Sequence, residues 1–161
     1  MKLDLGSGRV KKEGYTSVDV YPFRYLDVQH DIEEKLPFDD ASADEIYCSH
    51  VLEHCSMQAV PNMLRDWHRV LVDDGIVKII VPEIEVCMRN FLDAPESKKW
   101  GNVIEYIVGC QHHQVGQQNH KSAYTPTRIT ELLRTAGFKV NNLEIINNKV
   151  NDCIHLTASK Q

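Results

Sequence analysis

The sequence predicts an α/β three-layer sandwich, in which helices cover a mostly parallel sheet. Apolar runs of strand length alternate with amphipathic runs of helical length along the 161 residues. The run Ile76–Val81 is almost entirely apolar, which is typical of a strand covered on both faces. Hydrophobic residues make up 42% of the chain. This is enough for one core, and we expect residues 1–161 to form a single domain.

The first predicted strand ends in a glycine turn. Residues 2–8 read KLDLGSG, and a second apolar run with an acid follows at residues 18–20 (VDV). Glycines at a strand tip allow a tight turn and a close approach of the backbone to a ligand. An acid on the neighbouring strand can accept hydrogen bonds from both hydroxyls of a ribose. The pattern indicates a nucleoside site, with a plain tight turn beside a surface acid as the alternative.

The residues after this turn discriminate between nucleotide ligands. A dinucleotide site has a third glycine and a long helix that holds a pyrophosphate, but Val10 and Lys11 stand where that glycine could fall. Only about one helical turn fits between Gly8 and Tyr15, fewer residues than a parallel crossover usually needs. S-adenosylmethionine (SAM) has no phosphate, and loop amides with Asp4 could hold its amino-acid end. The stretch therefore favours SAM over NAD.

Further strands and a long helix are predicted next. Residues 25–28 and 44–48 have strand character, and between them Asp31 could reach an adenine amino group while Ile32 packs on the ring. An exposed acid at a strand end is the alternative for Asp31. The helix has apolar residues at helical spacing from Val60 to Leu71, and the strand Ile76–Val81 follows it.

The C-terminal part begins with the variable segment 83–125, which we expect to hold two helices and to lie on the substrate side. Thr125 and Pro126 then form a helix start, and Gly137 is well placed to end that helix. Two strands, at residues 138–146 and 153–158, are predicted to close the chain.

Composition excludes several classes of protein. A net charge of −5 argues against a nucleic-acid backbone as the main partner. The five cysteines include no C-x-x-C pair and read as reduced thiols. The sequence shows no signal peptide and no apolar run of membrane-spanning length. We therefore expect a cytoplasmic protein with no membrane partner.

In this order and spacing the motifs resemble class I SAM-dependent methyltransferases, most closely the small type-11 methyltransferase domains. The resemblance runs from about Leu3 to Phe138. The matching stretches are residues 3–8, 18–20, 31 with 36–38, 50–54, 68–71 with 75–82, and 132–138. The resemblance implies a Rossmann-like, seven-stranded, mostly parallel sheet with an antiparallel last strand, and SAM as the cofactor. It also marks a minimal version, without a full helix after the glycine turn and without the family's N-terminal helices.

The resemblance implies the cofactor-binding residues as well. The glycine turn would lie beside the methionine end, the acid of the second strand would hold the ribose, and Asp31 with Ile32 would surround the adenine. The end of the fourth strand would lie beside the ligand. The predicted cofactor-binding residues are Asp4, Gly6, Ser7, Gly8, Asp19, Val20, Asp31, Ile32, Ser49 and His50.

Histidines are the candidates for catalysis, because an acceptor hydroxyl must lose its proton and histidine is the usual base near neutral pH. The candidates are His50, His54, His112, His113 and His120. We place His120 first, because the run HKSAY before the Thr125 helix resembles a histidine-containing stretch of the family, and we name His54 with it. A solvated loop histidine is the alternative for each.

No metal is predicted, because the spacing of Cys110, His112, His113 and His120 matches none of the closed zinc patterns. The fourth strand is followed by neither of the motifs typical of base methylation. We therefore predict methyl transfer from SAM to a small-molecule or saccharide acceptor. The alternatives are a non-catalytic SAM-binding or partner-binding module and, third, an NAD-dependent oxidoreductase; the oligomeric state is left open.

Overall fold

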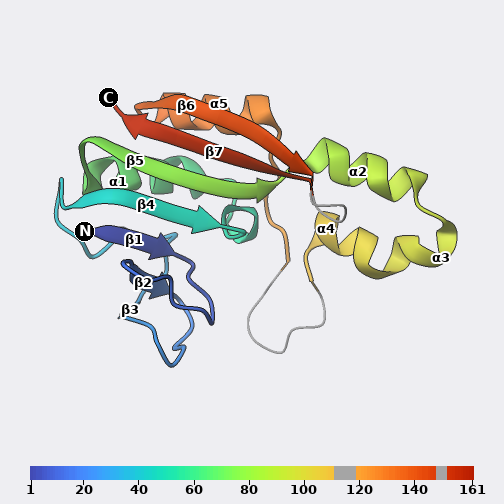
Figure 1. Ribbon diagram of the computed structural model, residues 1–161, viewed down its shortest axis with the longest axis horizontal. Helices are drawn as coiled ribbons and strands as arrows, with labels where there is room; N and C mark the ends of the chain where they lie inside the picture. The colour runs from blue at the N-terminus through green and yellow to red at the C-terminus, as the bar shows by residue number, and fades with distance from the viewer. Residues whose placement is uncertain (111–118, 148–151) are drawn as a thin grey trace.

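The computed structural model of the chain describes residues 1–110, 119–147 and 152–161. All its strands join one sheet in the order β3-β2-β1-β4-β5-β7-β6 (Figure 1). Strand β7 is antiparallel to β5 and β6, and the other pairs are parallel. The predicted Rossmann-like sheet with an antiparallel last strand is confirmed. The strands are β1 (Lys2–Leu5), β2 (Thr16–Asp19), β3 (Val28–Gln29), β4 (Ala43–Ser49), β5 (Leu71–Pro82), β6 (Phe138–Asn147) and β7 (Asp152–Lys160).

The helices fall into two groups. Helices α1 and α5 lie on one face of the sheet, whereas α2, α3 and α4 lie beyond the end of β5 (Figure 1). None of the described helices is long and apolar enough to cross a membrane. The helical elements are the 3₁₀ turn η1 (Leu52–His54), α1 (Val60–Val70), α2 (Ile84–Asp93), α3 (Glu96–Lys98), the π-turn η2 (Lys99–Val103), α4 (Ile104–Val108) and α5 (Pro126–Thr135).

Local sequence explains the two helices on the sheet. In α1 the apolar residues Val60, Leu64 and Trp67 are buried against the sheet, as their helical spacing predicts. Helix α5 begins where predicted: the Thr125 side chain accepts a hydrogen bond from the backbone N–H of Arg128, and proline follows at the first helical position.

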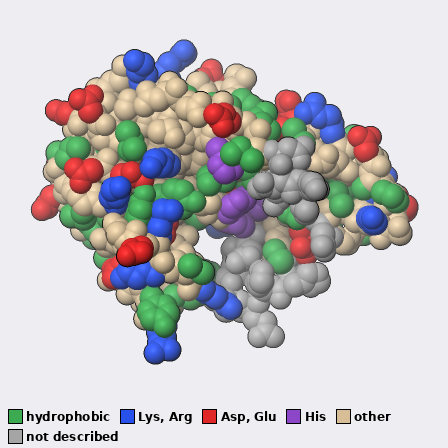
Figure 2. Space-filling view, in the orientation of Figure 1, with side chains coloured by type: hydrophobic (Ala, Val, Ile, Leu, Met, Phe, Trp, Pro, Cys, Tyr) green, Lys and Arg blue, Asp and Glu red, His purple; other side chains and the backbone are tan. Residues whose placement is uncertain are grey.

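The opposite face of the sheet carries no helix within the described residues (Figure 1). Along β5, Val77 and Ile79 are buried on the helix side, whereas Lys78 and Ile80 are only partly buried on the other side. Charged side chains of both signs are spread over this open face (Figure 2). The apolar run of β5 predicted cover on both faces, but the described residues place helices on only one of them.

The edge strand β3 is shorter than predicted. The sequence indicated a strand over residues 25–28, but only Val28 and Gln29 pair with β2. Asp27 accounts for the difference, because its carboxylate accepts hydrogen bonds from both the backbone N–H and the hydroxyl of Ser17, at 2.9 and 2.8 Å. A side chain therefore replaces the ladder bond that a longer strand would make.

The loop that leads into β4 is held by an arginine of α1. The guanidinium of Arg69, 20% exposed, donates to the carbonyl oxygens of Leu36 and Phe38 and to the carboxylates of Asp40 and Asp66. These bonds join α1 to the segment that follows Asp31 and Ile32, and so they support one wall of the site described below.

We expect Arg69→Lys to lower the free energy of unfolding by about 2 kcal/mol, since one ammonium cannot reproduce the fork of donors that holds four partners. The melting temperature should fall by about 4–8 °C. Arg65→Lys is the matched control, because Arg65 lies exposed on the same helix and bonds only to Asn62 among the described contacts. Equal melting temperatures for the two variants would contradict this role of Arg69.

Candidate functional site

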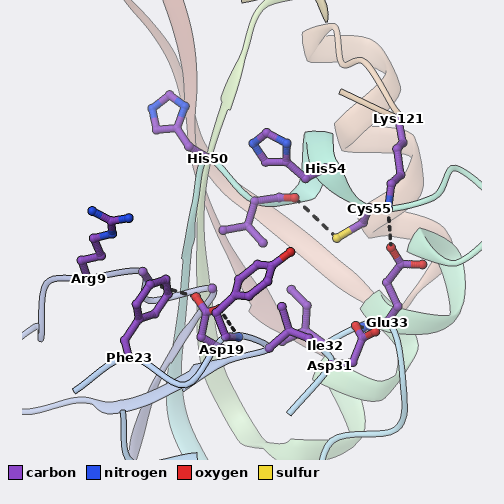
Figure 3. A pocket seen from close by; sticks show the side chains of 15 residues that line it. Arg9, Asp19, Phe23, Asp31, Ile32, Glu33, His50, His54, Cys55 and Lys121 are labelled. Carbon is purple, nitrogen blue, oxygen red and sulfur yellow. Dashed lines mark hydrogen bonds and ion pairs between the residues drawn. The ribbon is translucent and has the colours of Figure 1, made fainter. Parts of the chain in front are cut away.

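A cavity of about 540 Å³ opens where β1, β2 and β4 end. This volume is in the range that small-molecule sites occupy. Figure 3 shows the cavity with the histidines His50 and His54 on one side and Asp19, Ile32 and Asp31 across from them. The lining residues are Gly6, Gly8, Arg9, Asp19, Val20, Tyr21, Phe23, Asp31, Ile32, Glu33, His50, Val51, His54, Cys55 and Lys121.

The glycine turn after β1 forms the floor of the cavity. The backbone N–H groups of Gly6 and Ser7 both donate to the carbonyl of Val18, at 2.8 and 3.2 Å, which ties the turn to β2. Gly6 has φ +73° and lies so close to Val51 that an added Cβ would sit 2.3 Å from its Cγ2. Gly8 has φ +62°, but an added Cβ there would meet nothing within 4 Å. Only a glycine fits at Gly6, for reasons of both conformation and space.

Asp19, at the end of β2, is buried and fixed by two backbone groups. One carboxylate oxygen accepts a hydrogen bond from the N–H of Gly8 and the other from the N–H of Tyr21, each at 2.9 Å. These bonds orient the carboxylate, and each oxygen retains a second lone pair. Asp19 therefore presents an oriented pair of acceptors beside the glycine turn.

The third wall comes from the loop that contains Asp31. One oxygen of its carboxylate accepts a hydrogen bond from the N–H of Glu33 at 2.9 Å, and Ile32 between them is buried. The Glu33 carboxylate accepts from the N–H of Ser56 at 3.1 Å and lies 3.9 Å from the ammonium of Lys121 (Figure 3). Asp31 and Ile32 together offer an acceptor and an apolar surface, the combination that the sequence analysis expected around an adenine.

Histidines gather at the other side of the cavity (Figure 2). His50 directly follows β4 and has φ +55°. Its ring lies 3.9 Å from the sulfur of Cys153 and 3.4 Å from the carboxylate of Glu53. Hydrogen bonds with Cys153 and Glu53 raise the pKa of His50 to about 10. A non-glycine residue at positive φ is uncommon and frequently marks a functional site.

His54 and His120 face one another. Their ring centroids lie 5.0 Å apart in an edge-to-face arrangement. His54 Nδ1 lies 3.3 Å from the carbonyl oxygen of Asn119. Burial lowers the pKa of His120. The structure thus brings together the two residues that the sequence analysis named as catalytic.

The backbone of η1 explains how His120 reaches this place. The carbonyl of Glu53 accepts hydrogen bonds from the N–H groups of Lys121 and Ser122, at 2.7 and 3.0 Å. The carbonyl of Leu52 accepts from the hydroxyls of Ser122 and Tyr124, at 2.8 and 3.2 Å. These four bonds fix the chain that follows His120 against the turn that carries His54.

The cavity contains most, but not all, of the predicted cofactor-binding residues. Of the ten predicted residues, Gly6, Gly8, Asp19, Val20, Asp31, Ile32 and His50 line it.

Asp4, Ser7 and Ser49 are not among the lining residues. The predicted catalytic residue His54 lines the cavity, whereas His120 does not and contacts the ring of His54. Asp4 is buried in β1, and burial raises the pKa of its carboxyl. The predicted candidates His112 and His113 lie outside the described residues.

Seven lining residues were not predicted: Arg9, Tyr21, Phe23, Glu33, Val51, Cys55 and Lys121. The aromatic residues Tyr21 and Phe23 follow Asp19 closely in the sequence. This closeness to the proposed ribose-binding acid could have predicted that they line the cavity. Lys121 comes from the far end of the variable segment, and no local pattern indicates its position.

Comparisons with known proteins support one class. Residues 3–79 match the family model described as a methyltransferase domain. A search of curated proteins finds no match. Many solved structures resemble the chain, at identities that establish the fold alone.

Three of these structures illustrate the similarity. The 1,6-didemethyltoxoflavin-N1-methyltransferase of Burkholderia thailandensis, solved with 1,6-didemethyltoxoflavin and S-adenosylhomocysteine, has a TM-score of 0.69 and 20% identity, covering 99% of this chain and 70% of that one. An S-adenosylmethionine-dependent methyltransferase of Mesorhizobium loti has a TM-score of 0.68 and 13% identity, covering 99% and 90%. One from Methanosarcina mazei has a TM-score of 0.65 and 14% identity, covering 99% and 91%.

The fold and the family match confirm the resemblance predicted from the sequence. The chain has the fold of class I SAM-dependent methyltransferases. Its residues 3–79 carry the sequence pattern of the methyltransferase-domain family.

The two glycines of the turn provide a matched test of the floor of the cavity. Gly6→Ala and Gly8→Ala both place an alanine at positive φ, which costs about 1 kcal/mol. Only Gly6→Ala also collides with Val51. We therefore expect Gly6→Ala to destabilise the protein by at least about 1 kcal/mol more than Gly8→Ala in urea unfolding.

A second substitution separates the collision from the backbone strain. In the double variant Gly6→Ala/Val51→Ala the clash is removed. The destabilisation that Gly6→Ala causes should therefore be smaller in the Val51→Ala background than in the wild type, and close to the destabilisation caused by Gly8→Ala. If the double variant shows no such coupling, the contact with Val51 does not explain the glycine.

Proposed function

We propose that the chain binds SAM in this cavity and transfers its methyl group to a small-molecule or saccharide acceptor. The observation that carries the proposal is the pairing of the glycine turn with the oriented carboxylate of Asp19. Asp19 would accept hydrogen bonds from the ribose hydroxyls. Gly6, which has no side chain, would let the ligand approach the backbone of the turn closely. When bound, SAM supplies an electrophilic methyl group on a sulfonium.

The residues around the cavity fit SAM better than a dinucleotide. Residues 6–15 form turns and no helix, so no long helix N-terminus faces the cavity from this loop. The N–H of Gly8 donates to Asp19 and is therefore not free for a phosphate. The acids Asp19, Asp31 and Glu33 line the cavity alongside Arg9 and Lys121, and this mixed lining suits a ligand that carries both a cationic sulfonium and a carboxylate.

The acceptor side of the cavity is the one lined by His54, whose ring centroid lies 5.0 Å from that of His120. Methyl transfer needs the acceptor atom about 3 Å from the methyl and in line with it, so the residues beside the sulfonium position the acceptor. We propose that His120, with His54, contacts the acceptor and promotes loss of its proton when the acceptor is a hydroxyl. The Burkholderia neighbour, solved with a small-molecule ligand, supports an acceptor of this class.

A cytoplasmic setting is part of the proposal. All five cysteines are free thiols, and four of them are buried. Such thiols persist where the surroundings are reducing.

Release of S-adenosylhomocysteine from SAM, in the presence of fractionated small-molecule extracts, tests the proposed activity. We expect one or more fractions to support release and the protein alone to support none. Binding of SAM without release across varied extracts would instead favour the non-catalytic binding module. Recovery of NAD from the purified, denatured protein by mass spectrometry would overturn the cofactor assignment.

Asp19→Ala tests the ribose contact. We expect it to weaken SAM binding by about 2 kcal/mol, roughly 30-fold, because a charged acceptor of two hydroxyl hydrogen bonds is lost. Calorimetry with S-adenosylhomocysteine measures the change. The control is Asp73→Ala, an acid whose side chain is 98% exposed in the turn of β5. Equal affinities for the two variants would remove Asp19 from the site.

His120→Ala tests the acceptor side. Turnover should fall about 100-fold, the usual contribution of a proton-transfer residue, while SAM affinity changes by less than about twofold. The affinity serves as the internal control for folding of the cofactor side. A parallel loss of affinity and turnover would place His120 on the cofactor instead of the acceptor.

A further inference from the structure

Glu53 in η1 has a buried carboxylate that is only half satisfied. The residue is 2% exposed, and one of its oxygens lies 3.4 Å from His50 Nδ1. Its other oxygen, Oε2, is buried without a hydrogen-bond partner among the described residues. An unpaired buried carboxylate oxygen is costly, and buried acids are normally paired with donors or with metal ions. The arrangement therefore indicates a cationic partner at Oε2.

Two histidines lie where such a cation would bind. A carboxylate oxygen of Glu53 and one ring nitrogen each of His54 and His120 all lie within 4.8 Å of one another. A zinc ion about 2.1 Å from each would draw these atoms to about 3.4 Å apart, a closure that small side-chain rotations can supply. These three donor atoms come from two separate parts of the chain, η1 and the segment before α5.

The backbone around the histidines prepares their rings for this role. His54 Nδ1 lies 3.3 Å from the carbonyl oxygen of Asn119, and the backbone N–H of His120 donates to the carbonyl of Val108 at 3.0 Å. A ring nitrogen that donates to a carbonyl leaves the other nitrogen with a free lone pair, which is the usual arrangement for a metal ligand. His50 in turn is a positioning residue, because its Nδ1 lies 3.4 Å from one carboxylate oxygen of Glu53 and orients that group.

The donors are also held by rigid structure. Glu53 and His54 belong to the turn directly after β4, and the carbonyl of Glu53 accepts hydrogen bonds from Lys121 and Ser122. These bonds fix the position of the preceding residue, His120, relative to the turn. Such prior organisation keeps the donors together in the absence of a ligand.

We propose that Glu53, His54 and His120 bind one divalent first-row transition-metal ion, of which zinc is the model, at the wall of the cavity. Two imidazoles and one carboxylate are a donor set of catalytic zinc sites, which keep a further position open. Magnesium and calcium prefer oxygen ligands, so this nitrogen-rich set disfavours them.

The ion also narrows the class of acceptor, and this part rests on the proposed methyl transfer. His54 lines the cavity, so the open position of the ion faces the acceptor side. With the ion bound, His54 and His120 would act as its ligands and not as the base. The ion would bind the acceptor through an oxygen and lower the pKa of its hydroxyl, so that the proton is lost to water. The preferred acceptors are therefore hydroxyl or phenol compounds.

Zinc binding to the chelator-treated protein is the experiment that tests the site, and it needs no acceptor. We expect one equivalent of Zn²⁺ per chain by calorimetry, and a rise of the melting temperature on its addition. Glu53→Gln and His120→Asn should each weaken zinc binding at least 10-fold. Glu34→Gln, which changes an exposed acid near the cavity, is the control and should bind as the wild type does.

Cobalt substitution distinguishes this site from binding by thiols. The visible spectrum of the Co²⁺ protein should show ligand-field bands without a thiolate charge-transfer band, and Glu53→Gln should abolish them. We expect Glu53→Gln and His120→Asn to bind S-adenosylhomocysteine as tightly as the wild type, which would show that both variants are folded. A thiolate band, equal zinc affinity in Glu53→Gln and the wild type, or tight binding of Mg²⁺ alone would each overturn the proposed ligands.

The test also separates this site from the proposed activity. Zinc bound by these three residues in a protein that never releases S-adenosylhomocysteine would retain the metal site and remove the methyl transfer. If S-adenosylhomocysteine is released at full rate by a protein shown to bind no ion, the methyl transfer is retained and the metal site is removed.

Discussion

The site depends on the two backbone carbonyls of η1. Leu52 and Glu53 begin η1, shortly after β4 ends at Ser49, and their carbonyl oxygens accept four hydrogen bonds from residues 121–124. A chain segment that is remote in sequence is thereby fixed to the end of the central parallel strands. Without these bonds the cofactor side would keep its glycine turn and Asp19, but His120 and Lys121 would have no fixed place. The acceptor side of the cavity thus depends on two main-chain donors, the N–H groups of Lys121 and Ser122, and on two side-chain donors, the hydroxyls of Ser122 and Tyr124.

Much of the fold could be predicted because local patterns decide it. The period of Val60, Leu64 and Trp67 and the Thr125 cap each act within one element, and both helices form as expected. The length of β3 could not be predicted, because the carboxylate of Asp27 competes for the backbone of Ser17 only when the two strands lie side by side. The open face beside β5 depends on which helices lie nearby, and the apolar run of β5 alone carries no information about that.

The cofactor side of the site was more predictable than the acceptor side. A strand, a glycine turn and a second strand that ends in an acid follow one another in the sequence, and this order indicates the carboxyl edge of a parallel sheet. Seven of the ten predicted cofactor-binding residues line the cavity. Asp4 does not, since it lies inside β1. The grouping of Glu53 with His54 and His120 joins residues far apart in the sequence. A search for metal ligands by spacing around Cys110 could not find it, because Glu53 lies in another element.

The segment between β5 and α5 leaves the sheet after Pro82 and returns beside the same place at Tyr124. The backbone N–H of Ile84 donates to the carbonyl of Tyr124 at 3.0 Å, and Glu83 pairs with Tyr124 as an isolated parallel bridge. Helices α2 and α4 therefore lie within a loop whose two ends are already joined by the fold. Each doubling of the length of such a loop costs only about 0.6 kcal/mol of closure entropy. Insertions, deletions or whole replacements here would leave the sheet intact, so the acceptor side can diverge rapidly while the cofactor side stays the same.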